Sequence, residues 1–275
     1  MRRLFPLGVA LAAGVMLLFL LLPIVAIFAR VPPGDLVSAL GRGQATDALV
    51  VSIETNLIAL AAIVLVGTPT AWLIATRPGR LRDVAVTLVE LPLVLPPAVA
   101  GIGLLAAFGR VGLVGGHVHA IGSSLAFTKA AVVVAIAFVA SPFYVRSAIA
   151  AFESIDPAMT QASRTLGAGA GKTFVRIALP LAAGGLGSGA ALAFARGIGE
   201  FGATLMFAGS LRGVTQTLPL AIYEAFDLDF DLALAISALL VVISAVVLLL
   251  TKVVFRWRST SPSTTLFAPS APRST

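Results

Sequence analysis

Cysteine is absent from the chain and charged residues are scarce, and each absence narrows the class of protein. Without cysteine there is no disulfide framework and no thiol chemistry. Charged residues make up 11% of the 275 residues, whereas a soluble domain carries about 25%. Hydrophobic residues make up 59%, so the chain has too little polar surface to stay in water. We therefore expect an all-α, polytopic integral membrane protein.

The apolar segments also lack the side-chain groupings of other membrane protein classes. They hold no Ser/His pair, no HExxH motif and no paired aspartates, so we do not expect an intramembrane enzyme. A secondary transporter that works without an ATPase is the alternative. Paired intramembrane acids and an internal inverted repeat would favour that class, and neither is evident. His117 and His119 have no carboxylate or cysteine beside them, so we expect them to be solvated and to bind no metal.

About six apolar segments are long enough, or nearly long enough, to cross a bilayer, since a spanning helix needs roughly 20 apolar residues. The first is too long for the apolar region of a signal peptide, which has about 7–15 residues, so we expect it to be retained. A Ser-, Thr- and Pro-rich tail at 259–275 follows the transmembrane domain, residues 1–258, and we expect disorder there. The predicted spans are residues 5–29, 50–74, 84–108, 129–148, 181–208 and 232–255.

The net charge of +7 is distributed unevenly among the loops. In a soluble protein this charge would suggest nucleic-acid binding. Here the basic residues lie mostly between apolar runs, so we expect no nucleic-acid partner. Of the 19 Lys and Arg residues, 13 lie in one set of segments, 5 in the opposite set, and Arg196 lies inside a span. The positive-inside rule then predicts that both termini are cytoplasmic.

The segment Leu166–Thr173, LGAGAGKT, is similar to a phosphate-binding loop. Lys172 and Thr173 fit that motif, but Leu166 stands where its first glycine belongs. The preceding residues favour a helix rather than the required strand, and no acidic Walker-B-like strand is evident. We therefore interpret the segment as a Gly-rich turn between two short helices.

The predicted cytoplasmic connection, about residues 149–180, contains a more informative pattern. The string QAS at 161–163 is followed by Gly167 and by IALP at 177–180. This resembles the cytoplasmic loop of ABC importer permeases, which reads E-A-A, three residues, Gly, nine residues, I-x-L-P. The resemblance implies a short helix that docks on a separate ATPase subunit. The docking residues it implies are Gln161, Ala162, Ser163, Arg164, Thr165, Leu166, Gly167, Ile177, Leu179 and Pro180.

Physical chemistry is consistent with that assignment. A surface helix can end at Gly167, because glycine accepts a positive φ. Pro180 can start the next membrane helix, where a missing N–H costs little. Two residues depart from the family pattern: Gln161 replaces Glu, which removes a charge, and Ser163 replaces Ala.

Three further segments resemble the molybdate branch of the sulfate/molybdate permeases, over roughly residues 50–250. They are LPLVLPPAVAG at 91–101, ARGIGEFGAT at 195–204 and TQTLPLAIY at 215–223. The resemblance implies a type I ABC importer permease fold. It also implies that the chain is the channel-forming subunit for an oxyanion, most simply molybdate, with sulfate or tungstate as the alternatives.

The same resemblance implies the assembly. Two copies of the chain would pack around a central path in the cell membrane of a bacterium or archaeon, with two ATPase subunits below and an extracytoplasmic oxyanion-binding protein above. ATP and Mg would bind the ATPase partner. This chain would bind no cofactor and catalyse no reaction.

Arg196 and Glu200 form an i, i+4 pair in a predicted span, so they share one helix face. A charge at mid-bilayer costs at least about 2.5 kcal/mol, so each should face protein or water and have a partner. One interpretation is a polar element that lines or gates the anion path; the other is an ion pair that fixes helix packing.

Prolines and glycines mark the other candidate positions along the path. Pro92, Pro96 and Pro97 break the third span, which makes either a plain kink or a pathway-lining break. The small face around Gly185 and Gly189 allows either close helix packing or flexing between two states. The candidate path residues are Arg196, Gly199, Glu200, Pro96 and Pro97.

Overall fold

The computed structural model describes residues 4–115 and 125–259, except 33, 35–37, 39–40 and 42. The predicted tail beyond residue 259 and His117 and His119 lie outside the described residues. Every regular element in the described part is helical. The helices are α1 Leu4–Arg30, α3 Gly43–Ala75, α4 Arg80–Val94, α5 Pro97–Phe108, α7 Lys129–Glu153, α8 Pro157–Thr165, α9 Ala170–Thr173, the π-helical η1 Phe174–Ala178, α10 Leu179–Ile198, α11 Gly202–Ala208, α12 Leu218–Leu228 and α13 Phe230–Ser259.

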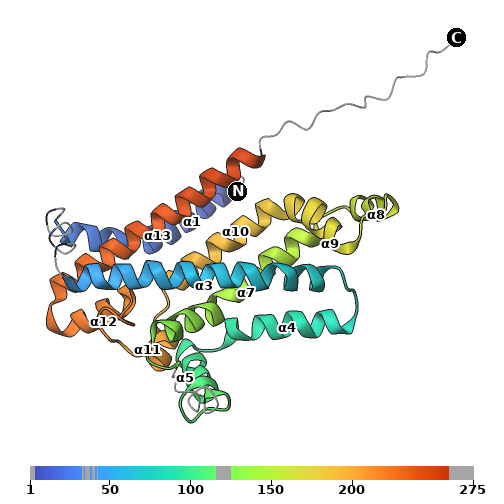
Figure 1. The fold of residues 1–275 in the computed structure, drawn as a ribbon. Helices are drawn as coiled ribbons and strands as arrows, with labels where there is room; N and C mark the ends of the chain where they lie inside the picture. Colours follow the sequence, from blue (N-terminus) through green and yellow to red (C-terminus); the bar gives the residue numbers. More distant parts are fainter. Residues whose placement is uncertain are drawn as a thin grey trace.

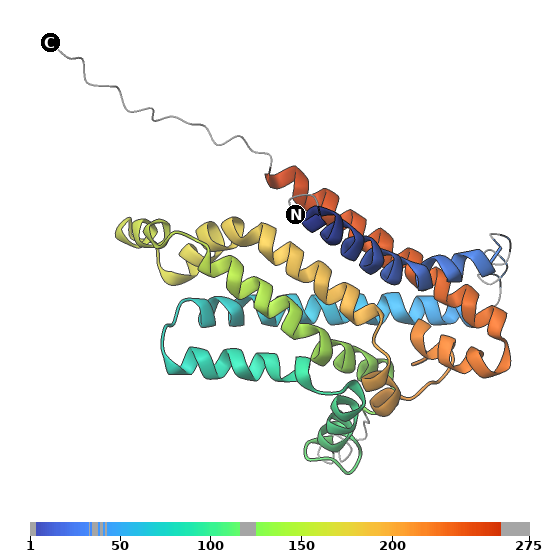
Figure 2. The same ribbon diagram turned by 180° about the vertical axis from the view of Figure 1, so that it is seen from behind.

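Within the described residues, five helices are long and apolar enough to cross a membrane, or six if the bent pair α4 and α5 is one span. This agrees with the predicted all-α fold of about six spans. The central helices are α3, α7 and α10, and α7 packs extensively on both of the others (Figure 1). The helix α1 lies along α13 at the edge of the bundle, and α8 and α12 lie at opposite ends (Figure 2).

Small residues bring α10 and α7 together. A Cβ built on Gly185 would lie 2.4 Å from Ala151 Cβ, and one on Gly189 would lie 2.8 Å from Ser147 Cβ. Ser147 also donates a hydrogen bond to the Gly185 carbonyl at 3.0 Å. Larger residues would push the two helices apart, so these glycines allow the close approach that the sequence predicted.

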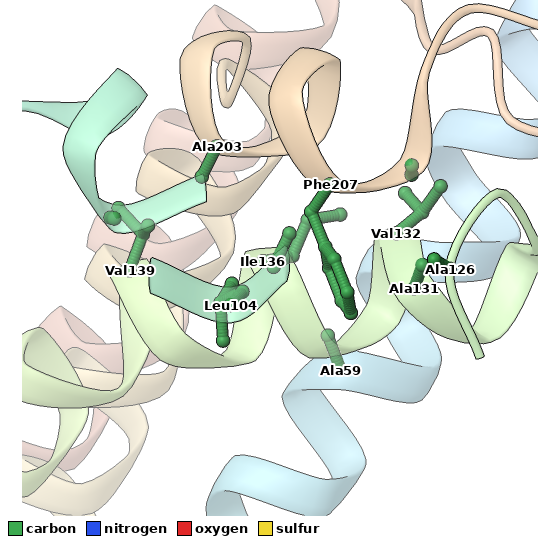
Figure 3. Close-up of a cluster of buried hydrophobic side chains, with 12 residues drawn as sticks. Ala59, Leu104, Ala126, Ala131, Val132, Ile136, Val139, Ala203 and Phe207 are labelled. Carbon is green, nitrogen blue, oxygen red and sulfur yellow. The ribbon is translucent and has the colours of Figure 1, made fainter. Parts of the chain in front are cut away.

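A compact apolar cluster joins α3, α5, α7 and α11. Phe207 is fully buried and points from α11 toward Ala59 on α3 (Figure 3). Its ring centroid lies 6.5 Å from that of Phe108 on α5. The cluster therefore holds α11 against the central helices, although α11 has only seven residues.

The third predicted span is broken where the prolines predicted a break. Helix α4 ends at Val94, Leu95 is extended, and α5 begins at Pro97, with the two axes bent by 112°. The residue before a proline disfavours helical backbone, and two consecutive prolines impose that restriction on Leu95 and then on Pro96. Pro92, in contrast, stays inside α4.

The fifth predicted span, 181–208, was wrong at both ends. The membrane helix begins earlier, because α9, η1 and α10 are continuous from Ala170 to Ile198. It also ends earlier: the chain leaves the helix at Gly199, and α11 is a separate short helix.

Pro180 lies in the first turn of α10, as predicted, but this is not a free helix end, because η1 runs directly into α10. A proline inside a helix crowds the carbonyl four residues back and donates no hydrogen bond. Here the preceding turn widens, and the Leu179 N–H bonds to the carbonyl of Phe174, five residues back. This π turn lets the helix continue through the proline.

Candidate functional site

The helix α8 protrudes from one end of the bundle and has no buried residue. It begins at a capped terminus, where Asp156 Oδ1 accepts the Ala158 N–H at 2.9 Å. It ends at Gly167, whose φ of 83° confirms the predicted positive value. The Gly167 N–H bonds to the Arg164 carbonyl and the Ala168 N–H to the Ser163 carbonyl, each at 3.0 Å. These two bonds form a Schellman motif, which fixes the end of the helix.

The docking motif falls into two structural parts. Gln161, Ala162, Arg164, Thr165 and Leu166 are exposed on α8 and at its end, so they are available to a partner. Three residues lie instead on the next helix, at η1 and the start of α10: they are Ile177, Leu179 and Pro180. The Gly-rich turn joins the two parts, so the motif comprises an exposed helix and the root of a membrane helix.

That turn does not have the structure of a phosphate-binding loop. The helix α8 precedes it instead of a strand, and Thr173 is 1% exposed. The Thr173 hydroxyl bonds to the Gly169 carbonyl at 3.3 Å and to Ser163 Oγ at 3.1 Å. It is therefore not free to hold a phosphate-bound metal ion, and the interpretation as a turn between two short helices is confirmed.

A pocket of about 360 Å³ lies between α8 and the ends of α3 and α7. Thr160, Gln161 and Arg164 form its α8 side, and Trp72 and Phe152 are on the opposite side. The exposed face of α8 thus stands away from the bundle instead of packing on it.

Arg196 and Glu200 form an ion pair, with 2.6 Å between Arg196 Nη2 and Glu200 Oε2. They do not lie on one continuous helix as predicted, because α10 ends at Ile198 and Glu200 lies in the break before α11. The second carboxylate oxygen, Oε1, accepts the Ala203 N–H at 2.8 Å. Glu200 therefore neutralises Arg196 and also satisfies a backbone donor in the first turn of α11.

The two charged side chains differ in exposure. Glu200 has a side-chain exposure of 1%, whereas that of Arg196 is 28%. Gly199 is exposed, and nothing lies within 4 Å of the position of a Cβ there. Arg196 and Gly199 therefore border open space, while Glu200 holds Arg196 from inside the protein.

The break after α10 meets the break between α4 and α5. A Cβ on Gly202 would lie 2.8 Å from Pro97 Cβ, and one on Gly101 would lie 2.7 Å from the Ala203 carbonyl oxygen. Pro96 and Pro97 are both exposed. The structure thus brings two interrupted membrane helices together, and the predicted path residues lie at or near their breaks.

Sequence reasoning missed Asn56, a buried residue on α3. Its Nδ2 donates to the carbonyl of Phe194 on α10 at 3.0 Å. A Cβ on Gly197 would lie 2.2 Å from Asn56 Oδ1. Asn56 therefore fixes the last turn of α10, which carries Arg196. A lone amide in the apolar run 50–74 was the signal that marks this residue.

Buried polar side chains also gather beyond the break. Gln216 donates hydrogen bonds to Ser210 and Glu224. Three buried side-chain atoms in the described part have no hydrogen-bond partner: Thr204 Oγ1, Gln216 Oε1 and Thr217 Oγ1. No group of three or more potential metal-ligating side chains is present among these residues either.

Ion pairs between helices flank the bundle. Glu54 pairs with Lys129 at 2.7 Å, and Glu90 pairs with Arg146 at 3.2 Å. The sequence assigned no role to either glutamate. The structure shows that each joins a neighbouring helix to α7.

Comparison with known proteins agrees with this architecture. The family model described as "Binding-protein-dependent transport system inner membrane component" matches residues 63–259. The molybdenum transport system permease protein ModB of Mycobacterium tuberculosis is 45% identical over 244 residues, which cover 89% of this chain and 92% of that protein. A probable transport system permease protein, NifC of Clostridium pasteurianum, is 38% identical over 256 residues, 93% of this chain and 89% of the relative.

A solved structure shows the same fold at low identity. It is a bacterial alginate ABC transporter in complex with an alginate pentasaccharide-bound periplasmic protein. One of its chains matches with a TM-score of 0.74 and 17% identity, covering 94% of this chain and 96% of that one. The chain is thus a multi-pass membrane protein with a type I ABC importer permease fold, and it belongs to the family of inner membrane components of binding-protein-dependent transport systems.

Proposed function

We propose that this chain is the permease subunit of an ATP-driven importer of an oxyanion, and that the oxyanion is molybdate. The choice of molybdate as substrate is supported by the similarity to several molybdenum transport permeases over most of the chain, at 45% identity for the M. tuberculosis protein. Sulfate and tungstate are the alternatives, because all three are tetrahedral dianions with similar hydrogen-bonding capacity.

The exposed helix α8 supports an ATPase partner. Its caps give it a defined shape without packing on the bundle, and its sequence resembles the loop that docks on the ATPase in this family. ATP and Mg then bind the partner subunits, and two copies of this chain form the path. Closure of the ATPase subunits displaces α8, and the attached helix α10 changes the exposure of the path. ATP-driven closure can shift the path between its two states only by as much as the contacts of α8 differ between those states.

Arg196 supports anion passage. A dianion that crosses a low-dielectric constriction needs positive charge or hydrogen-bond donors, and the Arg196 side chain is 28% exposed beside open space. A strong positive site would retain the anion, because conduction requires weak binding. Glu200 lowers that charge from the buried side, so the pair attracts the anion without trapping it.

The ends of the bundle support cytoplasmic termini and a cytoplasmic α8. Arg80, Lys172 and Arg176 lie near the α8 end. Glu224 and Asp227 lie on α12 at the opposite end. By the positive-inside rule the α8 end faces the cytoplasm, where ATP is available, and an extracytoplasmic binding protein delivers the anion at the α12 end.

Stimulation of ATP hydrolysis tests this proposal. The chain, its ATPase subunit and the binding protein are reconstituted in lipid, and the ATPase rate is measured with molybdate, tungstate or sulfate. Molybdate is expected to stimulate hydrolysis at the lowest concentration. Stimulation by sulfate alone would show that sulfate, and not molybdate, is the substrate. An ATPase that does not co-purify with the chain would contradict the permease assignment.

A further inference from the structure

A pair of hydroxyl groups links the docking helix to the membrane helix. Ser163 Oγ on α8 lies 3.1 Å from Thr173 Oγ1 on α9. Thr173 also donates to the Gly169 carbonyl at 3.3 Å. A hydroxyl has a single proton to donate, so Ser163 is the donor in the pair. Ser163 stands where the family pattern has alanine, so this chain has added the group that makes the bond.

The other side-chain hydrogen bonds of α8 stay within that helix and its N-cap. Among the described residues, the Ser163–Thr173 pair is the one side-chain hydrogen bond that joins α8 to another helix. The hydroxyls of Thr160 and Thr165 bond to carbonyls of α8 itself. The pocket of about 360 Å³ separates the Thr160–Arg164 face from α3 and α7.

Thr173 is well placed to pass on a movement of α8. It is 1% exposed and immediately precedes the π turn η1. The first residue of that turn, Phe174, has its ring centroid 5.7 Å from that of Trp72 and 6.2 Å from that of Phe152. The same helix then continues to Arg196. A shift of Thr173 therefore passes through the π turn η1 into α10.

We propose that the Ser163–Thr173 hydroxyl pair is a positioning contact that couples α8 to η1 and α10. The contact makes the docking helix and the start of the membrane helix move as one body, so that ATP-driven displacement of α8 reaches the path. Without it, α8 is joined to α9 and η1 only by the glycine-rich turn and by side-chain packing, and its movement is partly absorbed there. This inference rests on the proposed ATPase-docking function of α8.

The test compares molybdate uptake with ATP hydrolysis in proteoliposomes that hold the whole complex. Ser163→Ala and Thr173→Val each remove one hydroxyl, and the double variant removes both. Ser163→Thr and Thr173→Ser keep the hydroxyls. Thr160→Val is the matched control, because it removes an α8 hydroxyl that bonds only within α8.

Each single removal is expected to lower uptake per ATP hydrolysed by about fivefold, the factor that one ordinary hydrogen bond represents. The double variant should fall no further than the singles, and Ser163→Thr and Thr160→Val should match the wild type. The amount of co-purified ATPase should stay unchanged in every variant. If uptake per ATP hydrolysed is unchanged in Ser163→Ala or Thr173→Val while the ATPase stays bound, this inference is overturned but the proposed function is not. A wild-type chain that retains no ATPase would overturn the proposed function and this inference with it.

Discussion

Asn56 on α3 and Gly197 on α10 meet so closely that a Cβ at residue 197 would lie 2.2 Å from Asn56 Oδ1. The amide also holds the carbonyl of Phe194. This contact fixes where α10 ends, and the position of that end determines where Arg196 lies. The position of the charged pair thus depends on an uncharged residue on another helix.

Gly197→Ala is expected to destabilise the protein by about 1–3 kcal/mol, because a methyl group does not fit beside Asn56. The change is measured as the loss of folded protein on heating in detergent. Gly184→Ala is the matched control, since the same helix has open space there. Adding Asn56→Ala should recover part of the loss. Equal stability of the Gly197→Ala and Gly184→Ala variants would contradict the tight contact.

Arg196→Ala is expected to lower assembly of the complex, because it leaves the Glu200 carboxylate buried without its cation, at a cost of about 3 kcal/mol. Glu200→Ala should lower assembly too, since it removes the acceptor of the Ala203 N–H. Replacing both by Arg196→Met and Glu200→Gln should restore much of the assembly, because Gln keeps that acceptor without a charge.

Uptake by this double variant separates the two roles of the pair. If Arg196 serves the anion, molybdate uptake per assembled complex should stay well below that of the wild type. Uptake at the wild-type rate per complex would show that the pair is only structural.

Gly167→Val is expected to detach or uncouple the ATPase while membrane insertion stays normal. The left-handed backbone of Gly167 costs a non-glycine residue about 1–2 kcal/mol, and a β-branched residue resists it further. Open space surrounds this position, so backbone strain is the whole effect. Gly167→Asn is the control, because asparagine also ends helices in this conformation. ATP-dependent uptake by the valine variant at the wild-type rate would remove the docking assignment.

Cysteine labelling tests the orientation directly, because the chain has no cysteine of its own. Lys172→Cys is expected to be cytoplasmic and Asp227→Cys extracytoplasmic, and both side chains are exposed. A membrane-impermeant maleimide added to intact cells should label only the second variant. Labelling of residue 172 from outside would reverse the orientation.

Much of the fold was predictable because lipid imposes long apolar helices, and length and composition reveal these directly. The break at Pro96 and Pro97 was also predictable, since proline acts on its neighbours in sequence. The end of α10 at Ile198 was not. The break is accompanied by contacts of Gly197 with Asn56 on α3 and of Gly202 with Pro97 on α5, and both partners are remote in sequence.

The candidate site shows the same division. The positive φ at Gly167 followed from local chain chemistry, and the structure confirms it. Asn56, in contrast, lies 141 positions from Gly197 in the sequence, so no local pattern connects the two. The continuation of the helix through Pro180 depends on a π turn, which the residue pattern did not reveal.

Uptake of molybdate into proteoliposomes tests the central claim most directly. The chain is reconstituted with its ATPase subunit and the extracytoplasmic binding protein, and ATP is supplied on the side of α8. With the binding protein supplied on the α12 side, net molybdate transport should run from the α12 side to the α8 side. It should stop when ATP or the ATPase is omitted. Molybdate movement that continues without the ATPase, or ATP-dependent transport of another solute with none of molybdate, would contradict the account.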